Sequence, residues 1–154
     1  MNVRLGAGLA GAVVLALTAV PAARAEPPPG ADAIDSFPIA RGRYTTPGDF
    51  YAVFFQTPDG RFCGIYPNGG PLGCDATPLD APPGTSQTVV ISGVPAEYRH
   101  SDAPTFTRDV DVLAEGYRLE NWGASCGVGY QGTVTCKTYG QHGFTISSVY
   151  GVLW

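Results

Sequence analysis

Short runs of apolar residues alternate along the chain with clusters of glycine, proline and asparagine. In residues 50–55 both alternating faces are apolar, which predicts a strand that is buried on two sides. Residues 88–92 form a β-branched run between turn signals, and residues 109–112 and 144–150 alternate in polarity. Each of these patterns predicts a strand, and no window long enough for a helix has helical periodicity.

The first predicted hairpin places two cysteines opposite each other. Asn68-Gly69 favours a two-residue type I′ turn, because that turn needs positive φ at both central residues. Counting outward from this turn pairs Cys63 with Cys74. Directly opposed residues on paired strands have their Cβ atoms within reach of a disulfide. The register therefore predicts a Cys63–Cys74 bond across the hairpin.

A second hairpin is predicted by the other two cysteines. Pairing Cys126 with Cys136 leaves a three-residue turn, Tyr130-Gln131-Gly132, and we expect a type I turn that Gly132 closes in the left-handed conformation. Four cysteines allow three connectivities, and both turns favour the local one. Zinc binding is the alternative, but the cysteine spacings lack the short pairs typical of zinc sites. We find no internal repeat beyond these two cysteine hairpins.

The N-terminal segment has the pattern of a secretory signal peptide over residues 1–25, with cleavage before Glu26. A membrane anchor is the alternative, but the apolar run over residues 5–20 is shorter than a membrane span. Residues 26–48 are predicted to be a flexible Pro/Ala-rich tether, and residues 49–154 a single β domain. We therefore expect an exported protein, extracellular or in the cell wall, whose mature chain has no membrane anchor.

Composition supports an all-β domain and narrows the range of partners. The 154 residues include 21 glycines and 14 prolines, which favours turns and short strands over helices. We expect a small antiparallel sandwich or barrel of about six to eight strands. Nine Lys and Arg against thirteen Asp and Glu give a net charge of −4, which argues against nucleic acid as a partner.

Few residues are candidates for catalysis. The chain has two histidines, His100 and His142, and a Ser/His/Asp site would need one of them beside a serine such as Ser125 or Ser147. Asp109 and Asp111 would lie ~7 Å apart on one face of a strand, a separation that two-carboxylate glycosidases use. A solvated strand edge explains the same pair more simply. We therefore expect no catalytic residue, no metal and no cofactor.

Aromatic residues in the second half of the chain are the candidate binding residues. Trp122, Tyr139 and His142 lie at or beyond the ends of predicted strands. Aromatic side chains that remain exposed in such places suit the binding of a sugar or a protein. The expected partner is therefore a protein or a carbohydrate of unknown identity.

Two motifs resemble those of a group of small secreted proteins from mycobacteria and related actinobacteria. The first is Phe55-Gln56-Thr57-Pro58-Asp59, four residues before Cys63, and the second is His142-Gly143-Phe144 after the last cysteine. The chain departs from the group at Gln141, where the group has glycine. The resemblance covers residues 50–154 and implies a secreted, disulfide-bonded domain. It transfers no catalytic residue.

These observations lead us to expect a secreted, non-enzymatic binding module of the cell envelope or medium, present as a monomer. The alternatives are a small secreted hydrolase and an exported protease inhibitor. A cleft that joins His142 to a serine or an Asp pair would favour the hydrolase. A protruding, rigid loop over residues 78–86 would favour the inhibitor, and an exposed aromatic patch would favour the binding module.

Overall fold

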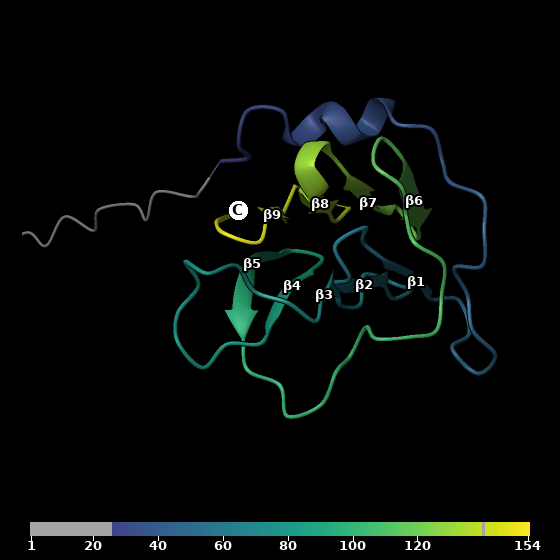
Figure 1. Cartoon of the computed structure of the whole chain (residues 1–154), viewed down its shortest axis with the longest axis horizontal. Coiled ribbons are helices and arrows are strands. Elements are labelled where there is room, and N and C mark those ends of the chain that lie inside the picture. The colour runs from purple at the N-terminus through teal and green to yellow at the C-terminus, as the bar shows by residue number, and fades with distance from the viewer. Residues whose placement is uncertain (1–25, 140) are drawn as a thin grey trace, which may run out of the picture.

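Two antiparallel five-stranded sheets pack face to face in the computed structural model, which describes residues 26–139 and 141–154 (Figure 1). The first sheet comprises β1 (Val53–Gln56), β2 (Phe62–Ile65), β3 (Leu72–Cys74), β4 (Gln87–Ile91) and β5 (Val94–Arg99). The second comprises β6 (Arg118–Asn121), β7 (Ala124–Val128), β8 (Val134–Lys137), β9 (Gly143–Ile146) and β10 (Gly151–Leu153). The predicted all-β sandwich is confirmed, with ten strands where we expected six to eight.

The signal-peptide prediction concerns residues 1–25 and lies outside the described residues. Across the described part of the chain, no helix combines the length and the apolar character that crossing a membrane requires.

The same strand arrangement occurs twice along the chain. In each sheet the strands pair in sequence order, and a disulfide joins the second strand to the third. Corresponding strands also face each other across the core, since β2 packs on β7 and β4 packs on β9. The two cysteine hairpins are therefore the central parts of two equivalent five-stranded meanders, a relation that the sequence alone did not show.

Both predicted disulfides are present, and all four cysteines lie in the buried core. Cys63 pairs with Cys74 and Cys126 with Cys136 in the registers expected from the turns. All four thiols are thus oxidised, which excludes the zinc alternative. One detail of the second turn was wrong, because Gln131 has φ 56° and is left-handed, whereas a type I turn needs a right-handed residue there.

The core between the sheets follows the alternation along each strand. Phe55, Ile65 and Val128 point inward with the cysteines, while Phe54 lies on the outer face of the first sheet. There Phe54 packs with a second cluster of buried residues: Ala52, Val89, Phe106 and Val110. The expectation that residues 50–55 contain a strand buried on both faces is therefore confirmed for Phe54 and Phe55 only.

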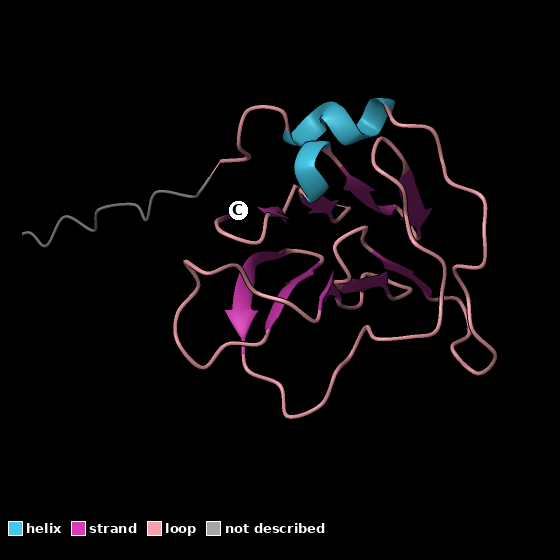
Figure 2. Cartoon of the chain, viewed as in Figure 1, coloured by secondary structure: helices cyan, strands magenta, loops and turns pink. Residues whose placement is uncertain are grey.

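A short 3₁₀ helix, η1 (Ala31–Ser36), covers the outer face of the second sheet (Figure 2). Ile34 is buried against Gly127, where a Cβ atom would lie 2.7 Å from the Ile34 side chain, so this strand position requires glycine. Lys137 bonds Asp32 and Asp35 at 2.9 and 2.7 Å. The flexible tether expected over residues 26–48 therefore does not describe this segment, because η1 is too short to show helical periodicity in the sequence.

The edges of the sandwich are covered by single bridges. Val112 bridges Gln56 beside β1, and Ile39 bridges Arg118 beside β6. Residues 109–112, which we expected to form an edge strand, contribute only this one bridge. On the other side, the backbone of Ala96 in β5 donates to the carbonyl of Trp154 at 3.2 Å and links the two sheets.

Candidate binding surface at one end of the sandwich

Four exposed aromatic side chains gather at one end of the sandwich. Phe50 and Tyr51 precede β1 and are 80% and 74% exposed. Trp122, in the β6–β7 turn, is 53% exposed, and Tyr139, in the β8–β9 loop, is 77% exposed. We call these four residues the aromatic end. They come from three segments that are remote in sequence, so the fold brings them together.

Direct contacts tie these segments to each other. The rings of Tyr51 and Trp122 meet edge to face, with centroids 6.1 Å apart. Asn121 donates its side-chain amide to the carbonyls of Tyr51 and Ile65, at 2.6 and 3.1 Å. Tyr139 lies beside the Trp122-Gly123 turn, since a Cβ atom on Gly123 would lie 3.5 Å from the Tyr139 side chain. Ser92, in the β4–β5 turn, also donates its hydroxyl to the Tyr139 carbonyl at 2.8 Å. The aromatic end therefore presents its side chains from bonded turns of both sheets.

Tyr51 and Trp122 share an unusual backbone conformation. Their φ angles are 66° and 51°, in the left-handed region that bulky side chains rarely adopt. Trp122 precedes Gly123, with φ 79°, in a tight hairpin turn where asparagine would be the usual residue. The Asn68-Gly69 turn of the first sheet has that usual pair. Left-handed aromatic residues cost stability, and such strain clusters at ligand-binding sites.

Replacing Trp122 tests whether its side chain contributes to the stability of the fold. We expect Trp122→Asn to change the free energy of unfolding by less than about 1 kcal/mol in either direction. The relief of backbone strain offsets the lost contact with Tyr51. Urea denaturation of the variant and the parent measures this change. A destabilisation well above this range would show that Trp122 is a packing residue.

A salt bridge holds the segment that carries Phe50. Asp49 accepts from the Arg108 guanidinium at 2.7 and 3.0 Å, and the guanidinium lies 4.5 Å over the ring of Phe54. The hydrogen bonds from Arg108, then that from Thr46, lower the pKa of Asp49 to about 2. Arg108 thus fixes the turn before β1 to the outer face of the first sheet.

The depressed pKa predicts a dependence of stability on pH. Asp49 has an unfolded pKa of about 3.9, so its contribution is complete above pH ~4 and is lost as pH falls through 2. We expect the parent to lose about 1–2 kcal/mol more than Asp49→Asn between pH 4.5 and pH 2. Urea titrations at several pH values measure the difference, and parallel curves for the two proteins would contradict it.

A groove of about 500 Å³ runs beside Trp122 along the outer face of the second sheet. Glu120, Ser125 and Lys137 are cross-strand neighbours on β6, β7 and β8 and form its floor. The remaining lining residues are Asp35, Asn121, Trp122, Gly123, Ala124 and Thr138. The groove therefore joins a polar floor to an exposed aromatic side chain.

The charges in this groove are paired within the protein. Lys137 bonds Asp32 and Asp35, and Arg118 bonds Glu120. Burial lowers the pKa of Lys137, but the hydrogen bonds and charges of the two aspartates outweigh it, so the pKa is raised and the ammonium stays charged. The groove thus combines many hydrogen-bonding groups with little uncompensated charge.

Comparison with known proteins assigns neither a family nor a function to this chain. No family model matches the chain, and no curated protein or solved structure matches it either. Conclusions about function therefore depend on the geometry of the described residues.

The histidines are not arranged for nucleophilic catalysis. The ring of His100 contacts the Gly84 carbonyl at 3.1 Å and Asp102 at 2.8 Å, which occupies both nitrogens. His142 lies in the β8–β9 loop, half-buried, where its carbonyl accepts from Thr138. Among the described residues, neither imidazole bonds a serine hydroxyl. Neither histidine is therefore part of a hydrogen-bonded Ser/His/Asp arrangement in the described part of the chain.

The aspartate pair is engaged by a single arginine. Asp109 and Asp111 lie within 3.3 and 3.8 Å of the Arg43 guanidinium, and Asp111 also accepts from the Arg43 backbone at 2.7 Å. Two carboxylates that share one cation have a structural role in attaching residues 43–44 to this edge. They do not form the acid and base of a glycosidase site.

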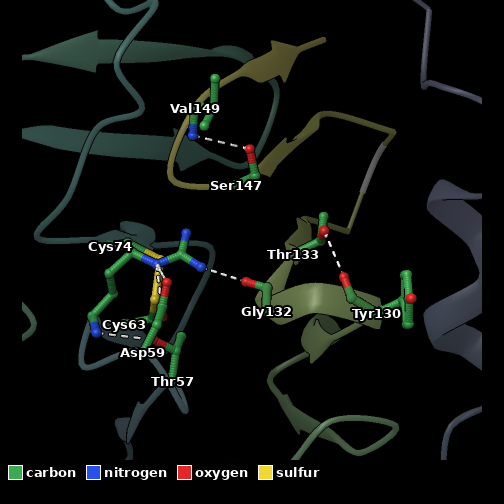
Figure 3. A network of polar contacts seen from close by, with 10 residues as sticks. Thr57, Asp59, Cys63, Cys74, Tyr130, Gly132, Thr133, Ser147 and Val149 are labelled. Atoms are coloured by element: carbon green, nitrogen blue, oxygen red, sulfur yellow. Dashed lines mark hydrogen bonds and ion pairs between the residues drawn. A yellow bond between two sulfur atoms is a disulfide. The ribbon is translucent and has the colours of Figure 1, made fainter.

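The residues that carry the family resemblance have structural roles. Thr57 and Asp59 bond each other and Arg61 in the β1–β2 turn, and Arg61 donates to the Gly132 carbonyl of the second sheet (Figure 3). In the second motif, a Cβ atom on Gly143 would lie 2.4 Å from the Cys136 carbonyl. The first motif therefore orients Arg61, whose hydrogen bond to Gly132 links the β1–β2 hairpin to the β7–β8 hairpin. Gly143 of the second motif allows β8 and β9 to approach closely.

Sequence reasoning identified half of the aromatic end. Trp122 and Tyr139 were candidates, whereas Phe50 and Tyr51 were assigned to a buried strand. The sequence does contain a signal that Phe50 and Tyr51 lie outside the strand, because the turn-forming cluster Pro47-Gly48-Asp49 directly precedes them. This cluster indicates that the chain enters β1 later than the apolar run suggests.

Proposed function

We propose that this protein is a secreted, non-enzymatic binding module of the cell envelope or extracellular medium, and that it contacts its ligand through the aromatic end. The observation that carries the proposal is the set of four aromatic side chains, each more than half exposed, on bonded turns at one end. Exposed clusters of large aromatic residues mark interaction sites, and their stiff side chains lose little entropy on binding.

Three further features support export. Residues 1–25 have the composition of a signal peptide, and both disulfides suit an oxidising compartment. The resemblance to secreted actinobacterial proteins leads to the same proposal.

The two alternatives have weaker support. A hydrolase would need His100 or His142 bonded to a serine, or a free Asp109–Asp111 pair. Among the described residues neither imidazole bonds a serine hydroxyl, and His100 and the aspartate pair are engaged in other contacts. An inhibitor would need a protruding, rigid loop over residues 78–86. Leu79 and Asp80 donate to the backbone of the β9–β10 turn at 3.1 Å each, which fixes the start of this loop but holds it against the body of the domain.

Co-sedimentation with the insoluble cell envelope of the source organism tests the proposal. The test variant combines Phe50→Ser, Tyr51→Asn, Trp122→Asn and Tyr139→Ser, with asparagine at the two left-handed positions. We expect the apparent affinity to fall at least about tenfold, because several exposed anchors are removed at once.

The matched control removes two exposed aromatic residues from the opposite end, Tyr130→Ser with Tyr150→Ser. We expect this control to bind like the parent. Equal binding by all three proteins, or no binding by the parent, would overturn the proposal. Near-ultraviolet circular dichroism and the urea midpoint establish that each variant is folded.

A further inference from the structure

We propose that the groove beside Trp122 binds a segment of neutral polysaccharide, with Trp122 as the surface on which a sugar ring stacks. This inference rests on the proposed function, and it names the class of ligand. A protein ligand at the same end is the outcome that the test below must separate from it.

The shape and lining of the groove favour a carbohydrate. Its volume of about 500 Å³ lies in the range of ~300–1,000 Å³ typical of small-molecule sites. Among the described residues that line it, Trp122 and Ala124 alone are hydrophobic, so an apolar peptide side chain would find few contacts in it. A sugar ring has one face rich in C–H groups and a rim of hydroxyls, which matches one aromatic surface beside a polar floor.

Hydrogen bonding in the floor suits hydroxyl groups. Glu120 and Asp35 offer carboxylate oxygens, each held by a single cation, and a carboxylate can accept up to about four hydrogen bonds. Ser125 lies between Glu120 and Lys137 across the three strands and supplies a hydroxyl that both donates and accepts. A single sugar hydroxyl can donate a hydrogen bond to one of these carboxylates and accept one from Ser125.

Charge indicates that the polysaccharide is neutral. Lys137 carries the one ammonium group among the described residues that line the groove, and it is already bonded to two carboxylates. The whole chain has a net charge of −4, which repels polyanions at a distance. An anionic polysaccharide would therefore find no free cation in the groove and an unfavourable field around it.

The backbone supplies an independent argument for Trp122. A tryptophan occupies the left-handed position before Gly123, although asparagine would fit that turn with less strain. The indole is half exposed, so burial does not explain its presence. A requirement for an aromatic surface at the mouth of the groove does explain it.

Selective destruction of the two ligand classes in the envelope provides the test. One portion of the insoluble envelope is digested with protease, and another is oxidised with periodate, which cleaves the C–C bonds between vicinal diols of sugars. We expect binding to survive protease treatment and to fall at least about tenfold after periodate. The polysaccharide released from the envelope is then separated by anion exchange, and we expect the unretained, neutral fraction to compete for binding.

Two single variants assign the site. Trp122→Asn should weaken binding to the protease-treated envelope at least about tenfold, and Ser125→Ala about threefold, while Tyr130→Ser at the opposite end should bind like the parent. Binding that is lost to protease and survives periodate would overturn the carbohydrate inference and leave the proposed function standing with a protein ligand. Competition by only the retained, anionic fraction would overturn the neutral class, and a complete absence of envelope binding would overturn both proposals.

Discussion

Replacing Cys63 and Cys74 together by alanine is expected to lower the free energy of unfolding by about 3 kcal/mol, and by more than the corresponding change at Cys126 and Cys136. The two disulfides close loops of similar length, with sequence separations of 11 and 10, so the entropic contribution of each is nearly equal. All four sulfurs are buried in the same core, so the cavities left by alanine are also similar.

The expected difference comes from the strands that each disulfide joins. In the first hairpin, Pro67 and Pro71 supply no backbone N–H groups beside the turn, so this ladder depends more on its covalent bond. The second hairpin has no proline, and Thr133 and Val134 favour an extended backbone. Urea midpoints of the two double variants decide the order. Equal midpoints, or a lower midpoint for the Cys126/Cys136 variant, would contradict this account.

Asp75→Ala is expected to lower the free energy of unfolding by about 3 kcal/mol, because one carboxylate organises a whole loop. Asp75 directly follows Cys74 and accepts four hydrogen bonds of 2.6–2.8 Å. The donors are the Gln87 amide, the backbone N–H groups of Thr105 and Phe106, and the Thr107 hydroxyl. Without the carboxylate, the buried amide of Gln87 loses one of its partners, and Phe106 is no longer held on the outer face of the first sheet.

Asp75→Asn is the matched variant for this prediction. Its side chain has nearly the same shape but one acceptor oxygen, so it can keep about half of the hydrogen bonds. We therefore expect it to lose roughly half as much stability as the alanine variant, measured by urea denaturation. Equal losses for the two variants would contradict this account, because they would show that neither the retained side-chain volume nor the one remaining acceptor oxygen stabilises the loop.

The local parts of this fold were predictable from the sequence, because turn chemistry acts between neighbouring residues. Asn68-Gly69 determines the register of the first hairpin, and that register places Cys63 opposite Cys74. The equivalence of the two sheets was not predictable, because it depends on β2 packing against β7 across the core. The helix η1 was missed for a different reason, since a single buried Ile34 gives no periodic signal.

The candidate site was predictable only where a turn and an aromatic residue coincide in the sequence. Trp122 before Gly123 is such a place. Tyr51 is not, because an apolar run continues through it into β1, and only its left-handed φ turns the side chain away from the strand pattern. The groove depends on η1 lying beside β8, which no local pattern indicates.

The most direct test of the central claim is to map where the ligand touches the protein. The measurement is a nuclear magnetic resonance titration of ¹⁵N-labelled mature protein with enzymatically solubilised envelope fragments. The account predicts shifts confined to the aromatic end and the groove beside it, including the indole N–H of Trp122 and the backbone amides of Tyr51, Ser125 and Tyr139. Shifts confined to the opposite end, around Tyr130 and Tyr150, or no shifts at saturating fragment concentrations, would contradict it.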